Sequence, residues 1–141
     1  MSSYYRCTHF DIMELVDRHT YTMFGDSAWM FLRVEALVAL DNIRNHFGVP
    51  VIVNDWSFGG GMEYRGFRPK TCDVGVDLSQ HRFGNAFDID VRGVSADNVR
   101  QEILRIKDDP IFLNITCMET GIPYVHFDCR NIPDRIRLIQ G

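Results

Sequence analysis

The chain has 141 residues, of which 45% are hydrophobic and 24% are charged, and its formal net charge is -4. This size and balance predict one soluble globular domain over residues 1–141, with a core that needs no disulfide staples. The sequence contains no basic run for nucleic-acid phosphates, no membrane span and no signal-peptide pattern, so we expect a protein that is made and folded in a cytoplasm and binds no nucleic acid.

Two helices are predicted in the first third of the chain. Residues 10–24 mix apolar and charged positions in a way that permits a short helix. Apolar residues then recur at helical spacing over residues 28–47, which predicts a longer helix with Asp26 or Ser27 as its N-cap. Gly48 is expected to end this helix.

A long irregular segment follows the first predicted strand. VPVIVND, residues 49–55, is predicted as a buried strand that leaves the long helix. Residues 56–78 then show no periodic pattern and contain consecutive glycines at 59–61. Long loops are uncommon inside compact domains and are often functional, so we expect this one to help build a site.

The second half of the chain is predicted to hold three strands and one helix. One strand is expected near residues 86–91, and Ser95 is expected to cap the helix that follows. Two more strands are predicted around residues 112–119 and 123–129, before a short polar tail. This order of elements predicts an α+β fold, a mostly antiparallel sheet with helices on one face and the loop and any site on the other.

A histidine and an aspartate flank a glycine turn in SQHRFGNAFDIDV, residues 79–91. His81 precedes the turn, and Asp88 lies in the alternating pattern of the strand that follows it. In the later strand YVHFD, alternation places His126 on the polar side. Two histidines and one carboxylate are a common zinc set that leaves a fourth position open to water. We therefore predict His81, Asp88 and His126 as ligands of Zn2+.

A hydrolytic zinc site also needs a base for its water. Glu119 lies seven positions before His126, and the turn TGIP between them can bring its carboxylate beside the metal. Spacing alone supports a solvated glutamate at a strand end equally well. Ligand histidines usually donate their second ring N–H to an acceptor, for which Asp90 and Asp128 are candidates. The alternative for each is a solvated strand acid, which is slightly favoured for Asp90. The remaining histidines are expected at the surface or in helix capping: His9, His19 and His46.

These motifs resemble a known family. SQHRFGNAFDI resembles the S-x-H-x-x-G-x-A-x-D-[IV] motif of the zinc D-Ala-D-Ala peptidases, the M15 peptidase family, whose second histidine ligand lies in a later short strand such as YVHFD. The chain is most similar to the small phage-type members, which carry an arginine-rich loop before the first motif and an E-x(6)-H arrangement, here Glu119 to His126. The hedgehog signalling domain shares the sheet and the metal geometry. The likeness runs from about residue 51 to residue 130.

The resemblance implies a hedgehog/DD-peptidase-like fold, with His81, Asp88 and His126 as zinc ligands and Glu119 as the catalytic base. It also implies a guanidinium that holds an acidic group of the substrate; surface ion pairing is the alternative role of the loop arginines. The hydroxyl of the tyrosine that shares a strand face with His126 could hydrogen-bond the reacting oxygen or could simply pack. The substrate-binding candidates are Arg65, Arg68, Ser79 and Tyr124.

The sequence also departs from the wider family pattern. Many relatives place an acid three residues before the last ligand and a histidine two residues before it. This chain has Pro123 and Tyr124 at these positions. The assignment of the base therefore depends on whether Glu119 reaches the metal.

The implied function is hydrolysis of a peptide bond in the stem peptide of bacterial peptidoglycan. The enzyme would be a D,D-carboxypeptidase or an endopeptidase of phage-type cell-wall lysis. Without a signal peptide, it would reach the wall after membrane permeabilisation or as a virion component. Two alternatives stay open: a non-catalytic zinc-binding module and a structural virion protein on the same fold. Both predict an intact wall, and the sequence favours no particular oligomeric state.

Overall fold

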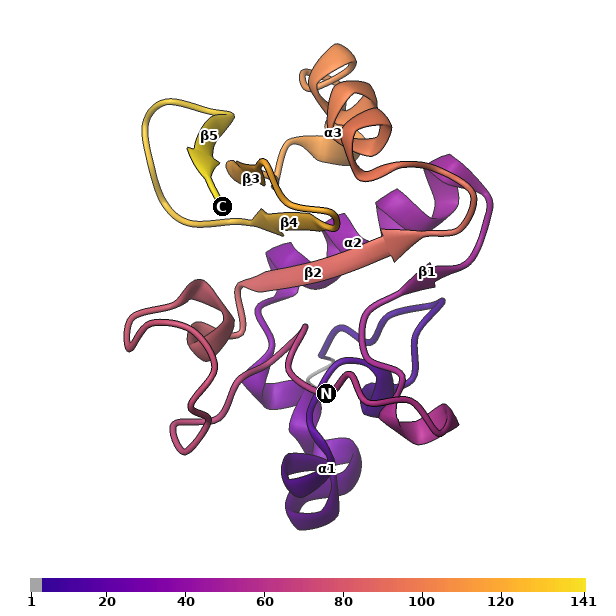
Figure 1. Ribbon diagram of the computed structural model, residues 1–141, viewed down its shortest axis with the longest axis vertical. Coiled ribbons are helices and arrows are strands. Elements are labelled where there is room, and N and C mark those ends of the chain that lie inside the picture. The colour runs from indigo at the N-terminus through magenta and orange to yellow at the C-terminus, as the bar shows by residue number, and fades with distance from the viewer. Residues whose placement is uncertain (1–3) are drawn as a thin grey trace.

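Five β-strands form one sheet in the middle of the molecule (Figure 1). This computed structural model describes residues 4–141. The strands lie in the order β1-β2-β4-β3-β5, and every neighbouring pair is antiparallel except β3 and β5, which run parallel. The strands are β1 (Val51–Ile52), β2 (Ala86–Val91), β3 (Cys117–Thr120), β4 (Val125–Asp128) and β5 (Arg137–Gln140).

In the part of the chain that the structure describes, three α-helices accompany the sheet: α1 (Arg18–Phe24), α2 (Val34–Phe47) and α3 (Ala96–Arg105). α2 contacts β2, α3 contacts β2 and β4, and α1 lies at the opposite end of the molecule from α3 (Figure 1). Within residues 4–141, no helix is long and apolar enough to cross a membrane.

One face of the central strands forms the core and the other carries polar groups. Phe87 and Ile89 of β2 and Phe127 of β4 are fully buried in the same apolar cluster as the inner residues of α2 and α3. Because side chains alternate along a strand, Asp88 and His126 lie on the opposite face. The predicted α+β domain with a mostly antiparallel sheet is confirmed, and the polar face is where a site would form.

Three predicted boundaries are confirmed. β2 spans residues 86–91, as its alternating pattern indicates. The Ser95 hydroxyl accepts a hydrogen bond from the backbone N–H of Asn98 and so caps α3. Gly48 ends α2 with φ of 67°, a left-handed conformation that glycine adopts without steric cost.

The predicted start of the long helix is wrong. Residues 25–31 form a 3-10 helix, the chain is extended at Leu32, and α2 begins only at Val34. The cause is a contact from a distant part of the chain, since the backbone N–H of Arg33 donates to the carbonyl of Gly84 at 2.9 Å. Neither Asp26 nor Ser27 caps α2, because its N-cap position is Arg33.

Other elements also differ from the prediction. The segment 10–24 is divided into a 3-10 turn, Ile12–Glu14, and α1. The strand expected over 49–55 is reduced to β1, because the backbone N–H of Asn54 donates to the Glu14 carbonyl instead of continuing the sheet. The short polar tail contains a strand that was not predicted, β5, which pairs with β3.

Gly84 joins the turn that carries His81 to β2. Its φ is 68°, and a Cβ at this position would overlap the carbonyl oxygen of Phe31. We expect Gly84→Ala to lower the free energy of unfolding by about 2 kcal/mol or more, because a left-handed non-glycine residue and a steric clash combine at one site. Urea unfolding followed by circular dichroism measures this loss.

Gly61→Ala is the matched control. Gly61 is exposed, has no positive φ, and its added Cβ would meet no atom within 4 Å. We expect its unfolding midpoint to stay close to that of the wild type. Equal stabilities of the two variants would contradict the role given to Gly84.

Candidate metal centre

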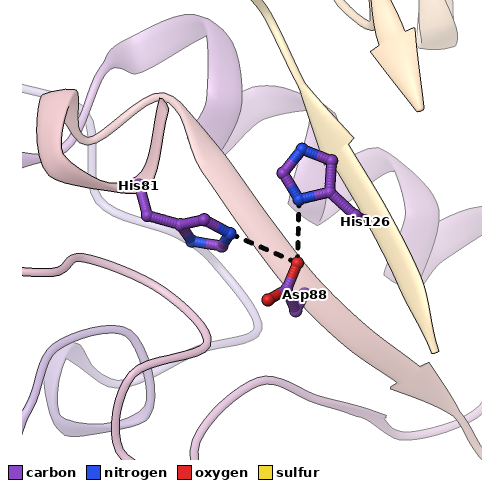
Figure 2. A group of neighbouring side chains, drawn as sticks. All are labelled: His81, Asp88 and His126. Atoms are coloured by element: carbon purple, nitrogen blue, oxygen red, sulfur yellow. Dashed lines mark hydrogen bonds and ion pairs between the residues drawn. The ribbon is translucent and has the colours of Figure 1, made fainter. Parts of the chain in front are cut away.

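The fold brings together the three predicted metal ligands. His81 lies in the 3-10 turn Gln80–Phe83, Asp88 lies in β2, and His126 lies in β4 directly opposite Asp88 in the strand register. One ligand atom from each residue lies within 4.8 Å of the others (Figure 2). All three side chains are buried. They form one group that could hold a metal ion.

The ring nitrogens of both histidines are oriented by hydrogen bonds. His81 Nε2 lies 3.2 Å and His126 Nδ1 lies 2.9 Å from Asp88 Oδ1. The other nitrogen of each ring faces an acceptor: His81 Nδ1 donates to the Gly66 carbonyl at 2.9 Å, and His126 Nε2 donates to Asp128 Oδ2 at 2.8 Å. This arrangement is typical of metal-binding histidines, whose second nitrogen is held by a carbonyl or carboxylate.

The backbone of the long loop contacts both Asp88 and His81 and so helps to position them. The N–H of Asp88 donates to the Arg65 carbonyl at 2.7 Å, and the N–H of Arg68 donates to the His81 carbonyl at 3.2 Å. The Gly66 carbonyl, between them, holds the ring of His81. A side chain at Gly66 would overlap the Leu15 carbonyl, so only glycine allows this close approach. The expectation that the loop helps to build the site is confirmed.

Electrostatics keep Asp88 ionised. Burial raises the pKa of this carboxyl, but hydrogen bonds from His126 and His81 outweigh burial and hold the pKa below its ordinary value. Arg68 adds a cation, with Nη2 at 3.3 Å from Asp88 Oδ2. The group therefore offers a carboxylate rather than a carboxylic acid at neutral pH.

His126 lies between two carboxylates. Burial lowers the pKa of its imidazole, whereas hydrogen bonds to Asp128 and Asp88 raise it, and the net result is a pKa of about 9. Metal-free protein therefore carries an imidazolium here at neutral pH. A metal ion bound at Nδ1 would take the place of a proton.

Metal binding is therefore expected to depend on pH. Below pH 9, binding at His126 must displace a proton, so the affinity for Zn2+ should rise about tenfold per pH unit and level off near the pKa of about 9. Isothermal titration calorimetry in buffers of different ionisation enthalpy measures both the affinity and the released proton. An affinity that is constant between pH 7 and pH 9 would contradict this arrangement.

Zinc affinity is expected to rise with pH, whereas the stability of the metal-free protein should fall as the pH rises. The folded pKa of His126 lies above its ordinary value of 6.5, so its charge stabilises the fold below pH 6.5. This contribution is lost as the pH rises through about 9. Thermal melting in a chelator should therefore show a falling midpoint over this window.

A cavity of about 480 Å3 opens beside the group. It combines charged and polar side chains from the loop and from the polar face of the sheet with a rim of aliphatic residues. The predicted site residues that line it, besides the three in the group, are Arg68, Ser79, Glu119 and Tyr124.

The structure separates the two candidate arginines. Arg68 lines the cavity, and its Nε donates to the Tyr64 carbonyl at 2.8 Å, which fixes the guanidinium. Arg65 is not among the described residues that line the cavity. Its Nη1 donates to Asp90 at 2.8 Å, and its guanidinium lies over the ring of Tyr124 at 5.2 Å. Of the two candidates, Arg68 is thus the one that lines the cavity, which Arg130 also lines.

Glu119 and Ser79 occupy different places around the cavity. Glu119 extends from β3, and among residues 4–141 no side-chain hydrogen bond or ion pair holds its carboxylate. Its charge contributes to the raised pKa of His126, as expected for a nearby anion. The Ser79 hydroxyl accepts a hydrogen bond from the backbone N–H of His81 at 3.3 Å, so it stabilises the turn that carries this residue.

The two acids predicted as partners of the ligands behave differently. Asp128 is fully buried and accepts a hydrogen bond from His126, so of its two candidate roles it has that of a partner of this histidine. Asp90 pairs instead with Arg65, and its side chain is 50% exposed. Sequence reasoning missed Arg130, which holds Asp128 with two hydrogen bonds of 2.7 Å. The alternation in HFDCR, which places an arginine two positions after the acid, is the signal that points to this pair.

The other three histidines lie outside the group, as predicted. His9 is exposed and hydrogen-bonds Asn45, and His46 is exposed and pairs with Glu102 at 2.7 Å. His19 is exposed on α1.

Two imidazoles and one carboxylate are a donor set that suits divalent transition metals, and three protein ligands leave a coordination position open. The polar cavity beside them gives that position access to a small molecule or a peptide. Comparisons with models of protein families, with curated proteins and with solved structures found no match.

Proposed function

We propose that the protein is a zinc-dependent peptidase that hydrolyses a peptide bond in the stem peptide of bacterial peptidoglycan. The observation that carries the proposal is that a buried group of two histidines and one aspartate shares a cavity with Glu119, whose carboxylate has no side-chain partner within residues 4–141. The resemblance of SQHRFGNAFDI and YVHFD to the M15 motifs supports the same reaction and a hedgehog/DD-peptidase-like fold. The enzyme would act in phage-type lysis, after membrane permeabilisation or from a virion.

The donor set fits zinc. His81 would bind through Nε2 and His126 through Nδ1, because these nitrogens face Asp88 while the opposite nitrogens are held by acceptors. A zinc ion bound there would lower the pKa of its water from about 15.7 toward roughly 7 and would polarise a carbonyl.

Glu119 has the properties of a general base. Its carboxylate lines the cavity and has no competing side-chain partner among the described residues. It would accept a proton from the attacking water and then deliver it to the leaving amine. Tyr124, also in the lining, would hydrogen-bond the oxygen of the scissile carbonyl.

Arg68 would hold a carboxylate of the stem peptide. Its guanidinium lines the cavity and is oriented by Tyr64 and Asp88, with a side chain that is only 12% exposed. A planar fork meets a carboxylate with two parallel hydrogen bonds, and partial burial strengthens such a contact. This placement would align the scissile bond with the reacting groups.

Mass spectrometry of purified peptidoglycan tests the proposal. Samples are incubated with the zinc-loaded protein, with protein stripped by a chelator, and with stripped protein to which zinc is restored. We expect new stem-peptide products in the first and third samples, and their masses would distinguish a D,D-carboxypeptidase from an endopeptidase. Stoichiometric zinc together with an intact wall would overturn the enzyme and favour a non-catalytic metal-binding module.

A further inference from the structure

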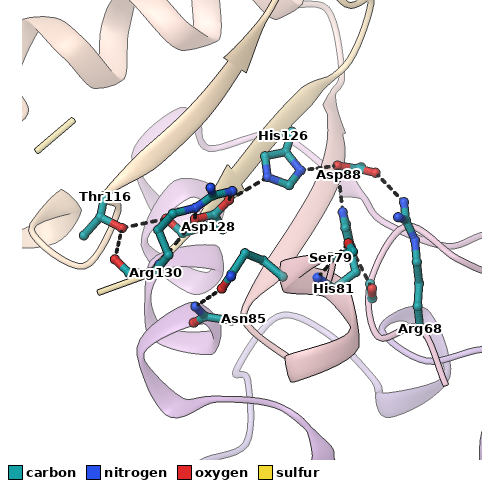
Figure 3. Close-up of polar contacts among 11 residues, drawn as sticks. Arg68, Ser79, His81, Asn85, Asp88, Thr116, His126, Asp128 and Arg130 are labelled. Carbon is teal, nitrogen blue, oxygen red and sulfur yellow. Dashed lines mark hydrogen bonds and ion pairs between the residues drawn. The ribbon is translucent and has the colours of Figure 1, made fainter. Parts of the chain in front are cut away.

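A continuous line of five charged or polar side chains crosses the candidate metal centre (Figure 3). It runs from Arg68 through Asp88, His126 and Asp128 to Arg130. Each contact pairs a donor with a carboxylate, and the distances range from 2.7 to 3.3 Å. The two arginines therefore lie at opposite ends of the line, and the side chains of Arg68 and Arg130 are 12% and 26% exposed.

Arg130 clamps the carboxylate of Asp128. Its Nε donates to Oδ1 and its Nη2 donates to Oδ2, both at 2.7 Å, and its backbone N–H approaches Oδ1 at 3.3 Å. This two-point contact fixes the plane of the carboxylate as well as its position. Asp128 has no exposed surface, so water does not compete for these oxygens.

The backbone around the clamp is fixed as well. The Thr116 hydroxyl donates to the Arg130 carbonyl at 2.6 Å, and the backbone N–H of Thr116 donates to the Asp128 carbonyl at 3.0 Å. Asp128 is also paired with Cys117 in the register of β3 and β4. Arg130 thus approaches Asp128 from a rigid segment rather than from a free chain end.

The fixed carboxylate determines which nitrogen of His126 faces the other ligands. Asp128 Oδ2 accepts from both Arg130 Nη2 and His126 Nε2, so Nε2 must carry a proton. The ring then presents Nδ1 to the group formed with Asp88 and His81. Turning the ring by 180° about Cβ–Cγ would put Cε1 in the place of Nε2 and Cδ2 in the place of Nδ1. Both hydrogen bonds would then be lost, and Nδ1 would point away from the metal position.

We propose that Arg130 is a positioning residue of the metal centre, which holds Asp128 so that His126 binds the metal through Nδ1. It acts through Asp128 and need not contact the metal or a substrate. Lysine is a poor substitute, because its point charge does not form the planar two-point contact. The inference concerns metal binding and holds whether or not the protein is a peptidase.

Zinc affinity of Arg130→Met tests the inference. Methionine keeps an unbranched apolar stem and removes the clamp. We expect zinc to bind about 10- to 100-fold more weakly, the usual effect of losing an outer partner of a metal ligand. Arg130→Lys should lose less, and competition with a chromogenic chelator measures both. Affinities are compared only for the fraction that is folded in the metal-free state.

Arg137→Met is the matched control. Arg137 is also a partly exposed arginine of this sheet, but it pairs with Asp134 and does not contact Asp128. Its zinc affinity should equal that of the wild type. A similar loss in both variants would indicate a general effect of removing positive charge and would overturn the inference.

The second readout reports the bound nitrogen directly. In protein labelled with 15N and loaded with 113Cd, we expect one-bond metal–nitrogen coupling to Nδ1 of His126. In Arg130→Met this coupling should weaken or be shared with Nε2, whereas a purely structural role would leave it unchanged. Unchanged coupling and affinity in the folded variant would overturn the inference; if the methionine variant fails to fold, the same comparison is made with Arg130→Lys.

The zinc-binding test of Arg130 and the peptidoglycan test of the peptidase can fail independently. Zinc bound in this manner by a protein that leaves peptidoglycan intact would refute the peptidase and keep the role of Arg130. Hydrolysis of peptidoglycan, together with unchanged zinc affinity in Arg130→Met, would support the peptidase and refute the role of Arg130.

Discussion

Replacing His81 with alanine is expected to weaken zinc binding by more than about 100-fold, beyond the 10- to 100-fold effect typical of an outer partner of a metal ligand. The reason is that two of three protein ligands remain, and a position that was filled by imidazole becomes open to water. Peptidoglycan hydrolysis should be lost with the metal. Calorimetric titration with zinc and mass spectrometry of the wall measure the two effects.

His81 is the ligand whose removal disturbs the fold least. Asp88 contacts both histidines and Arg68, so its loss would leave several buried groups without a partner. His81 is held by a single backbone carbonyl besides Asp88. The alanine variant should therefore fold, with a moderate decrease in melting temperature.

His46→Ala is the control for this prediction. His46 is exposed in the last turn of α2 and pairs with Glu102, outside the cavity. Its removal should leave zinc affinity and hydrolysis unchanged. Wild-type zinc affinity in His81→Ala would show that the metal, if any, binds elsewhere.

Replacing Glu119 with glutamine is expected to reduce hydrolysis by about 10²- to 10⁴-fold, the usual contribution of a general base, while zinc remains bound. Glutamine keeps the shape of the side chain but does not accept a proton at neutral pH. Because Glu119 is not one of the three grouped ligands, zinc stoichiometry should equal that of the wild type. The loss should appear in kcat, with little change in KM.

Glu35→Gln provides the comparison. Glu35 is an exposed residue of α2 near Arg33 and does not line the cavity of the metal group. Full activity is expected from this variant. If Glu119→Gln also retains full activity with bound zinc, another group must serve as the base and the proposed role of Glu119 is wrong.

Local patterns were sufficient for the elements that present the ligands. The alternation in AFDIDV predicts β2 to the residue, and the same rule places His126 on the polar side of β4. Ser95 marks the start of α3 for a local reason, since its hydroxyl bonds a backbone group three positions away. Such signals lie within a few residues of the element that they specify, so they can be read from one segment alone.

The candidate site was only partly predictable for the same reason. Three candidate ligands are visible in the sequence, two of them on the polar faces of predicted strands, and the register of β2 and β4 then pairs Asp88 with His126. The Gly66 carbonyl that holds His81 has no signal of its own, because every residue carries a carbonyl. Its role appears only when the loop lies beside β2.

Length, composition, alternation and caps thus determined from the sequence alone that this is an α+β domain with two histidines and one aspartate on the polar side of its fold. Tertiary structure decided the start of α2, the addition of β5 and the choice between Arg65 and Arg68 at the cavity. It also decided that Arg130 clamps Asp128. Long side chains and backbone groups have several partners within reach, and only the packing of distant segments selects among them.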